Sequence, residues 1–437
     1  MYAFARALRG VAAGALCAAA AGAPRALAAQ HAVAPPAAAP PARSVTLAAA
    51  LTAARRANPD LVVARLREDS ARGERAIAAA LPNPTLGVVP NVPTQYSLTE
   101  PVDVTPARLF RTRAARLGAD ATRLDEADAR RTTDYAVRQS YYDVLLAQAL
   151  RDVAAEQREA VRQVLAADSV RLRDGDVPAQ NVVRSELEYA HSDAALARGT
   201  AQVHAGRLAL QQLMGVAAPD TGLAAAGVLR FVPVPIDTAG LRALALRSRP
   251  DLRSAGVRVA QSRALVSNAR AQVVPVPQLS YVTQQHQRFD NGHFYSFGVG
   301  AALPFPYLFS GERTRARAGL AAAEVAADRA RLQVETDAAT ALDQYQVSRG
   351  LAERYERGLL AKARQAVATA RYAYQAGAIS QLELLDALRA DADTRADYYT
   401  AVHDYWLGVF AVERAAGVEV AGADAAADAS TDVASSP

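Results

Sequence analysis

The segment Phe294–Leu303 reads FYSFGVGAAL, and the rest of the chain is organised around it. Apolar side chains alternate in it with small or polar ones, at Tyr295, Phe297, Val299, Ala301 and Leu303. A period of two predicts a β-strand, because successive side chains of a strand point to opposite faces. We therefore expect a strand with one apolar face and one small or polar face.

A long helix is predicted after this strand. Pro304 and Pro306 end the strand, and an Ala-, Glu- and Arg-rich run without proline extends from Gly311 to Gln375. Its apolar residues recur three or four positions apart, the spacing of a helix seam, at Leu351, Tyr355, Leu359, Ala363, Val367, Ala370 and Tyr374. About 60 residues at ~1.5 Å each make a rod roughly 90 Å long.

Length and composition favour an extended helical body. The 437 residues exceed one typical domain, and 51% of them are apolar although only 6% are aromatic. Abundant alanine suits close helix seams better than one large globular core.

Residues 1–28 have the pattern of a secretory signal. Arg6 and Arg9 precede the apolar run Gly10–Gly22, and Ala26-Leu27-Ala28 fits a small-x-small cleavage site. Cleavage removes three arginines and no acid, so the formal charge falls from +5 to +2 (5 − 3). Nucleic acid is therefore not an expected partner.

Two further observations narrow the class of protein. Cys17 is the one cysteine and lies within the signal behind a bulky Leu16, so neither a lipid anchor nor a disulfide nor a thiolate site is expected. No later segment holds the ~18 consecutive apolar residues of a membrane-spanning helix. If the mature chain spans a membrane, strands in a closed barrel must do so.

The chain after the signal divides into a linker, two similar halves and a tail. Residues 29–45 form a Pro/Ala linker, 46–218 a first repeat, 219–236 a connecting segment, 237–418 a second repeat and 419–437 a disordered tail. The first repeat is expected to contain helices over 46–57 and 59–81, strands within about 84–104, and a helical hairpin with arms 111–172 and 178–214. The second repeat has the same order, with strands within about 277–304.

Matching motifs indicate this internal twofold repeat. The motif Asn58-Pro-Asp-Leu61 matches Arg249-Pro-Asp-Leu252 at an offset of 191 residues (250 − 59). Gly175 and Gly377, each at a helix reversal, are 202 apart (377 − 175), as are Arg111 and Arg313. The additional residues fall in the second strand hairpin, near the turn signal Asp290-Asn291-Gly292.

Four strands per chain are too few to close a barrel, whereas a symmetric ring of three copies supplies twelve. The expected fold is therefore mainly α with a small β part. Long helical hairpins form an α-barrel, and four strands per chain contribute to a trimeric 12-stranded β-barrel.

Several motifs point to one protein family. They are Asn58-Pro-Asp-Leu61, Leu81-Pro-Asn-Pro84, Tyr96-Ser-Leu98, Tyr141-Tyr-Asp143 and, most specific, Tyr372–Ala387 (YAYQAGAISQLELLDA). Through these motifs the stretch from Val45 to Val418 resembles the TolC-type outer-membrane efflux factors. Leu303–Phe309 (LPFPYLF) is similar to the branch that serves heavy-metal pumps of the resistance–nodulation–division (RND) class.

The resemblance implies a location and a set of partners. Such proteins form homotrimeric ducts, with a β-barrel in the outer membrane of a Gram-negative bacterium and a helical tunnel across the periplasm. They dock on a periplasmic adaptor (membrane fusion) protein and an inner-membrane RND-type transporter. The expected partners are further copies of the chain, these two proteins and outer-membrane lipid, and no cofactor is expected.

The first strand hairpin departs from the family pattern. Pro90, Pro93 and Pro101 crowd it, and each proline removes a donor from the strand ladder. Glu100 falls on the same face as Tyr96 and Leu98, which is costly in the middle of a membrane but tolerable near its edge. We expect this hairpin to be short.

The two helix reversals are the expected docking tips for an adaptor. Glycine allows the left-handed backbone of a reversal, so a purely structural role for Gly175 and Gly377 is compatible with docking. The candidate docking residues are Leu172, Gly175, Val177, Tyr374, Gly377, Ile379 and Ser380.

Glu383 and Asp386 match acidic positions of the family's inner-end constriction. Three copies would place a ring of carboxylates around the pore entrance, which attracts cations. For Glu383 there is an alternative, because Ser380-Gln-Leu-Glu383 has the pattern of a capping box.

Neither a metal site nor an enzyme is expected. The histidines are scattered with no pair at i, i+4 and are expected to be solvated or at hairpin tips: His191, His204, His286, His293 and His403. Gly298-Val-Gly300 lacks a third glycine and precedes a proline, so it is not a dinucleotide loop.

The leading hypothesis is the outer-membrane exit duct of a tripartite efflux pump, with metal cations as one cargo class. An exit duct of a type I protein-secretion system would share every feature above. A structural periplasmic coiled-coil scaffold is the rival outside transport, and the alternating strands argue against it.

Overall fold

The computed structural model describes residues 44–90, 94–220, 222–237, 240–285 and 293–418. The predicted signal (1–28), nearly all of the linker, Pro93, His286, the turn at Asp290-Asn291-Gly292 and the tail (419–437) lie outside the described residues. All described residues belong to one compact unit.

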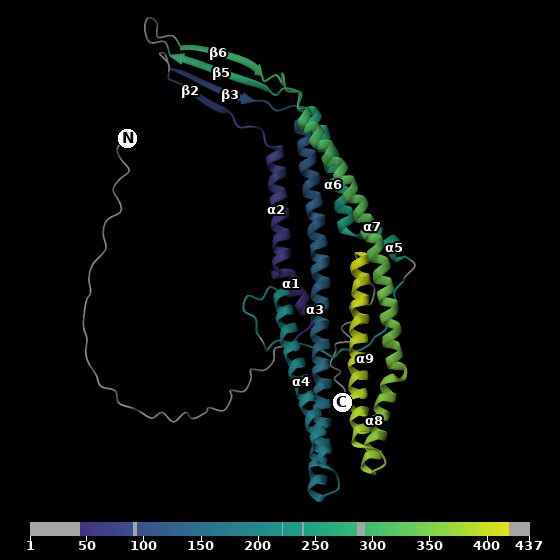
Figure 1. The fold of residues 1–437 in the computed structure, drawn as a ribbon. Helices are drawn as coiled ribbons and strands as arrows, with labels where there is room; N and C mark the ends of the chain where they lie inside the picture. Colours follow the sequence, from purple (N-terminus) through teal and green to yellow (C-terminus); the bar gives the residue numbers. More distant parts are fainter. Residues whose placement is uncertain (1–43, 91–93, 221, 238–239, 286–292, 419–437) are drawn as a thin grey trace, which may run out of the picture. The chain divides into compact units, whose positions relative to one another are not determined.

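The described chain is mainly helical, with one four-stranded sheet (Figure 1). Its first half contains α1 (Leu47–Ala57), α2 (Pro59–Ala79), β2 (Thr85–Val89), β3 (Gln95–Pro101), α3 (Pro106–Asp174) and α4 (Ala179–Leu213). Its second half contains α5 (Leu241–Ser248), α6 (Pro250–Ala271), β5 (Pro277–Gln285), β6 (His293–Ala301), α7 (Ser310–Arg354), a π-helical turn η1 (Tyr355–Leu359), α8 (Leu360–Gln375) and α9 (Gln381–Ala416). In Figure 1, α2, α3, α6 and α7 lead to the sheet, and the α3–α4 and α8–α9 turns lie at the opposite end.

The sheet is antiparallel, in the order β2-β3-β5-β6. The first hairpin is the shorter, with strands of 5 and 7 residues against 9 and 9 in the second, as its prolines predict. A further pair was not anticipated: β1 (Ser44–Val45) lies parallel to β4 (Ala224–Ala225), so the last residues of the expected linker form a strand.

Two helix predictions need correction. The helix expected from residue 111 begins at Pro106, a residue well suited to the first helical position because its missing N–H needs no partner there. The rod expected to run unbroken to Gln375 is interrupted by η1, where Gly358 leaves helical φ/ψ. A π turn inserts a residue and shifts the seam, and Leu359 within it is exposed although the spacing predicts it to be buried. Leu351, which precedes the turn, is exposed as well, because the buried stripe of α7 runs through Ser348 and Ala352 instead.

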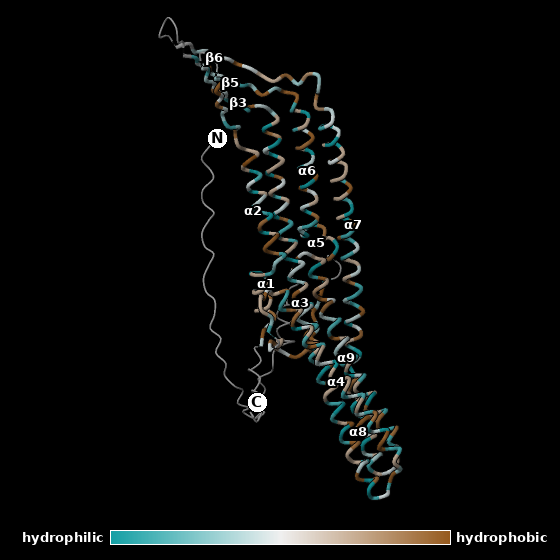
Figure 2. The backbone as a smooth tube through the Cα atoms, turned by 60° about the vertical axis from the view of Figure 1, so that its left-hand side comes forward, coloured by the Kyte–Doolittle hydropathy of each residue, from teal (hydrophilic) through white to brown (hydrophobic). Residues whose placement is uncertain are grey.

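The main core surrounds the predicted Tyr141-Tyr-Asp143 motif. Tyr142 stacks in edge contact on Phe410 of α9, with ring centroids 5.1 Å apart, and Trp406 is fully buried beside them. The Tyr141 hydroxyl donates to the Ala226 carbonyl at 2.5 Å and thereby holds the β1–β4 pair against α3. In Figure 2 apolar residues recur along every helix among polar ones, as expected of long amphipathic helices.

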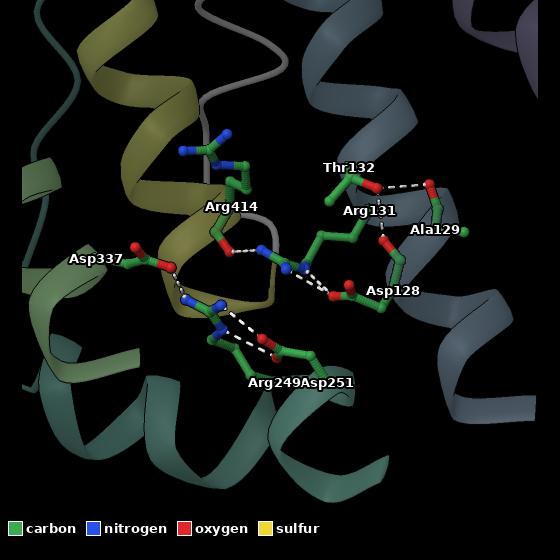
Figure 3. A network of polar contacts seen from close by, with 8 residues as sticks. All are labelled: Asp128, Ala129, Arg131, Thr132, Arg249, Asp251, Asp337 and Arg414. Carbon is green, nitrogen blue, oxygen red and sulfur yellow. Dashed lines mark hydrogen bonds and ion pairs between the residues drawn. The ribbon is translucent and has the colours of Figure 1, made fainter. Parts of the chain in front are cut away.

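Arginine side chains join the helices close to this core (Figure 3). Arg249 is 3% exposed and pairs with Asp251 at 2.6 Å and with Asp337 of α7 at 2.7 Å. Arg131 of α3 pairs with Asp128 at 2.6 Å and also donates to the backbone carbonyl of Arg414 in α9.

Candidate functional site: the amphipathic sheet and the helical tips

The strand register gathers the large apolar side chains on one face of the sheet. Directly paired residues of antiparallel strands share a face, and Leu86, Leu98, Tyr281 and Phe297 form one such row across all four strands. Phe297 is 81% exposed, and the neighbouring Val88, Tyr96, Leu279, Tyr295 and Val299 are exposed as well.

The opposite face carries mainly small and polar residues, together with Val89 and Val282. Ser97 pairs with Gly87, and Ser280 pairs with Gly298. A Cβ added to Gly87 would lie 2.5 Å from the Ser97 hydroxyl, and one added to Gly298 would lie 2.6 Å from the Ser280 hydroxyl. A side chain at either glycine would therefore have to displace that hydroxyl.

The large apolar side chains on this face of the sheet are exposed and are not packed against the core. Contiguous exposed apolar surface of this kind marks contact with a membrane or another protein. Glu100 lies on it, as predicted, paired with Leu279 toward one end of the strands. The strands β2 and β6 each have a single partner among the described residues, so both edges of the sheet are open.

At the other end of the helices, both reversals are made by glycine in the left-handed region. Gly175 has φ 83° and Gly377 has φ 73°, as predicted for helix reversals. The Asp176 amide donates to the Arg171 carbonyl at 2.8 Å, and the Ala378 amide donates to the Ala373 carbonyl at 2.8 Å. No atom lies within 4 Å of a Cβ built on either glycine, so backbone conformation alone requires it.

The fold brings the two tips together around one groove of about 470 Å³. Five of the seven candidate docking residues line it: Val177, Tyr374, Gly377, Ile379 and Ser380. Leu172 and Gly175 are exposed beside it without lining it.

A buried polar cluster beside the groove was missed by the sequence analysis. The Asp168 carboxylate is fully buried and accepts hydrogen bonds from Ser185 of α4 at 2.5 Å, Tyr374 of α8 at 2.6 Å and Gln381 of α9 at 2.6 Å. It thus joins both helical hairpins. Burial and the bond to Asp168 raise the pKa of Tyr374 to about 12, so its hydroxyl stays protonated and donates.

A sequence signal for this cluster does exist. Asp168 continues the apolar stripe of Val161 and Val164, both buried, at helical spacing. A carboxylate on an apolar stripe requires partners, because an unpaired buried charge is costly. Two of these partners, Tyr374 and Gln381, are more than 200 residues from Asp168 in the sequence. The spacing of residues along the chain therefore could not predict them.

The two candidate acidic residues differ in their surroundings. Glu383 makes the predicted capping box: its carboxylate accepts from the Ser380 amide at 2.7 Å, and this bond lowers the pKa of Glu383. Asp386 has a side chain 57% exposed, 3.5 Å from Arg389. Arg389 itself is held by Glu188 of α4 at 2.9 Å, so the Asp386 carboxylate is only loosely paired.

The expectation of solvated or tip-located histidines is wrong for His403. Its ring is buried and lies 2.8 Å from Asp143 and 3.1 Å from Asp404. Burial alone would lower the pKa of His403, but hydrogen bonds to both carboxylates raise it to about 9. Within the described ranges, no group of three or more His, Cys, Asp or Glu side chains is arranged to hold a metal ion.

Comparison with known proteins finds a family match for the second half of the chain. Residues 241–418 match the family of outer membrane efflux proteins. The chain carries an outer membrane efflux protein domain. The predicted resemblance to outer-membrane efflux factors is thereby confirmed, as are the predicted outer-membrane location and the prediction that the chain is not an enzyme.

One relative and two solved structures are similar to the chain over most of its length. The cobalt-zinc-cadmium resistance protein CzcC of Cupriavidus metallidurans is 25% identical over 384 residues, which are 85% of this chain and 90% of CzcC. A membrane protein from Pseudomonas aeruginosa has the same fold, with a TM-score of 0.75 and 20% identity over 85% of this chain and 90% of its own. CusC, which forms a transmembrane channel, has a TM-score of 0.68 and 20% identity over 85% and 92% of the two chains.

No helix of the described residues has an apolar stretch long enough to cross a membrane.

Proposed function

We propose that this outer membrane efflux protein is the exit duct of a tripartite efflux pump. Three copies form the duct, and each contributes four strands to a 12-stranded β-barrel and its helical hairpins to an α-barrel across the periplasm. One observation carries the proposal: the sheet has a solvent-exposed apolar face, a face of small and polar residues, and two open edges. Lipid suits the first face, a water-filled lumen suits the second, and neighbouring copies pair with the edges.

The two halves of the chain have the same order of elements, which supports an origin by internal duplication. Each contains a helix that begins at an X-Pro-Asp-Leu motif, a strand hairpin, a long helix and a returning helix. Two similar halves in each of three copies would supply similar helical hairpins all round the tunnel.

Cysteine pairs test the ring. Cys17 is the only cysteine of the chain and lies in the predicted signal, so introduced cysteines stand alone. One cysteine on β2 and one on β6, scanned over their registers, are expected to cross-link into trimers in outer-membrane fractions. A matched pair on β3 and β5, which already neighbour each other, is expected to react only within one chain. Recovery of a monomer in the soluble periplasmic fraction would overturn the proposal.

We further propose that the groove between the tips receives a periplasmic adaptor that connects the duct to an inner-membrane RND-type transporter. Exposed turns beside a groove lined by Tyr374, Ile379 and Val177 offer an apolar contact bordered by polar residues. Ile379→Asp is expected to abolish adaptor capture while trimers still assemble. Ala378→Asp, which places the same charge at a position outside the groove lining, is the matched control.

Metal cations are the proposed cargo class. The resistance that names CzcC concerns cobalt, zinc and cadmium, and the relationship covers most of both chains. Deletion of the gene is expected to sensitise cells to these cations, and a wild-type copy restores growth. If metal tolerance were unchanged but export of a drug or a protein were lost, the proposed cargo class would be wrong. The proposal that the protein is an exit duct would still stand.

A further inference from the structure

Positive charge is concentrated where the two longest helices leave the sheet. Residues 106–116 of α3 and 310–320 of α7 together contain seven arginines and one acid, a formal charge of +6 (7 − 1). The rest of these two helices, 117–174 and 321–354, contains 13 arginines and 17 acids, a formal charge of −4 (13 − 17). The basic excess therefore lies at one end of the helical body, beside the strands (Figure 1).

Four of these seven arginines are exposed and lack an acidic partner. Among the described residues, no carboxylate lies at ion-pair distance from any of the four, which are Arg113, Arg116, Arg315 and Arg317. Arg111 differs from them, because it donates to the Asp103 carboxylate at 3.0 Å and to the Ala78 carbonyl at 3.2 Å. Arg111 thus has a structural role, whereas the exposed four are available to a ligand outside the chain.

The internal repeat places this feature in both halves. Arg111-Thr-Arg113 and Arg313-Thr-Arg315 are 202 residues apart (313 − 111), and Arg113 and Arg315 are the exposed member of each motif. Three copies of the chain would carry six such motifs. Arginines would then surround the molecule just beyond the strands.

Exposed apolar residues lie between the strands and these arginines. In the segments that join strands to helices, Phe305 is 88% exposed, and Val104, Leu303 and Tyr307 are exposed as well. The order along the molecule is therefore an apolar strand face, then aliphatic and aromatic side chains, then arginines. A bilayer has the same order of hydrocarbon, interface and phosphate, and aromatic side chains are enriched at its interface.

The arginines are at a suitable depth for lipid phosphates. Arg113 follows the first residue of α3 by seven positions, and Arg317 follows the first residue of α7 by seven, so each lies about 10 Å along its helix. The headgroup layer on one side of a bilayer is roughly 5–8 Å thick. Long arginine side chains extend toward it, and a guanidinium binds a phosphate through two parallel hydrogen bonds.

We propose that Arg113, Arg116, Arg315 and Arg317 bind the headgroups of anionic phospholipids in the periplasmic leaflet of the outer membrane. The inference rests on the proposed function, in which the sheet is the membrane-embedded part. Lipids with a net negative charge are selected over zwitterionic ones, because four unpaired cations per chain attract net charge. The bound lipids fix the depth at which the sheet sits in the membrane.

Lipid titration of the purified full-length protein in nonionic detergent tests the proposal, with bound lipid counted by native mass spectrometry. We expect phosphatidylglycerol to bind about tenfold more tightly than phosphatidylcholine, because each arginine near a headgroup adds attraction. Changing all four arginines to Gln should abolish this preference and leave phosphatidylcholine binding unchanged. The double variant Arg113→Gln with Arg315→Gln, which keeps half of the charge, should lose part of the preference.

The matched control removes four arginines elsewhere on the same stretch of chain. Arg329, Arg354, Arg364 and Arg371 of α7 and α8 are also exposed, and their change to Gln should leave the preference intact. An excess of inorganic phosphate should not displace the lipid, because acyl chains against the apolar strand face add binding that free phosphate lacks. Displacement by phosphate would overturn the proposal by showing a site for free anions.

Other outcomes separate this inference from the proposed function. Trimers with cross-linked β2 and β6 that bind the two lipids equally would overturn the lipid site alone. A loss of preference as large in the control as in the four-arginine variant would also overturn it. Unchanged lipid binding with altered ion selectivity in planar bilayers would instead place the arginines at the lumen, and a soluble monomer would overturn both proposals.

Discussion

The two halves of the chain share an order of elements but differ in the side chains that stabilise them. At the first X-Pro-Asp-Leu motif, Asn58 caps α2 by accepting from the Asp60 amide at 2.9 Å. At the second, Arg249 makes buried ion pairs with Asp251 and Asp337 instead. The backbone plan therefore tolerates different chemistry at equivalent positions.

The halves are also coupled unequally. Asp168 from the first half is held by Tyr374 and Gln381 from the second, whereas the equivalent position of the second half, residue 370 (168 + 202), is an alanine. Asp143 likewise pairs with His403 across the halves. Matching backbones thus set the shape, and a few unmatched polar residues connect one half to the other.

The largest expected effect comes from removing that connection at the tips. Asp168→Ala leaves the hydroxyl donors of Ser185 and Tyr374 without their acceptor, whereas the Gln381 amide keeps the Asn181 carbonyl at 2.9 Å. The change costs about 4 kcal/mol of local stability, since each buried unsatisfied group costs about 1–3 kcal/mol. Hydrogen exchange of the tip amides should accelerate by more than a hundredfold. Asp176→Ala, an exposed acid in the same turn, is the control and should change little.

If Asp168→Ala and Asp176→Ala behaved alike, the two hairpins would be held together by apolar contacts alone. The small cluster of Val161, Val164, Val367, Leu384, Leu385 and Leu388 would then be sufficient.

The next largest effect is the pH dependence of the His403 contact. The folded pKa of His403, about 9, exceeds its ordinary value of 6.5, so the charged ring stabilises the fold. That contribution is complete below about pH 6.5 and is lost as the pH rises through about 9; it amounts to about 3 kcal/mol at 1.36 kcal/mol per pKa unit. Urea unfolding followed by the fluorescence of the single Trp406 measures it.

His403→Gln keeps a polar side chain but no titratable ring. We expect its stability to lie below that of the parent at pH 6 and to approach it near pH 10. A constant gap between the two proteins over this range would show that packing, and not charge, makes His403 important.

A smaller and symmetric effect is expected at the two reversals. Gly175→Ala and Gly377→Ala each force an L-residue into the left-handed region at a cost of about 1 kcal/mol. Gly256→Ala in α6, a helical position with open space around it, is the control and should stabilise by up to ~1 kcal/mol. Unequal losses at the two tips, measured by thermal unfolding, would show that the halves are not equivalent there.

The smallest change in stability, under about 0.5 kcal/mol, is expected for Asp386→Asn, since the residue is exposed and loosely paired. If three copies of Asp386 surround the pore entrance, this variant should lower cation selectivity and block by multivalent cations in planar-bilayer conductance. Glu383→Gln preserves a capping side chain while removing the charge, so it separates the two roles of Glu383. Unchanged conductance in both variants would contradict the hypothesis of an acidic ring at the pore entrance.

The sequence alone was sufficient for local structure and for family. Strand alternation, X-Pro helix starts and glycine reversals each act within a few residues, so the positions of β5 and β6, of α2 and of both tips followed from them. The capping box at Ser380 and Glu383 was predictable for the same reason.

Only the tertiary structure decided which distant residues meet. The Asp168 cluster, the burial of His403 and the β1–β4 pair each join segments tens to hundreds of residues apart, and no local rule encodes such partners. The break at η1 also escaped prediction, because an interrupted helix keeps nearly the same apolar spacing as a continuous one. Polar contacts between distant segments form only when the helices pack together. The spacing of residues along the sequence therefore cannot predict them.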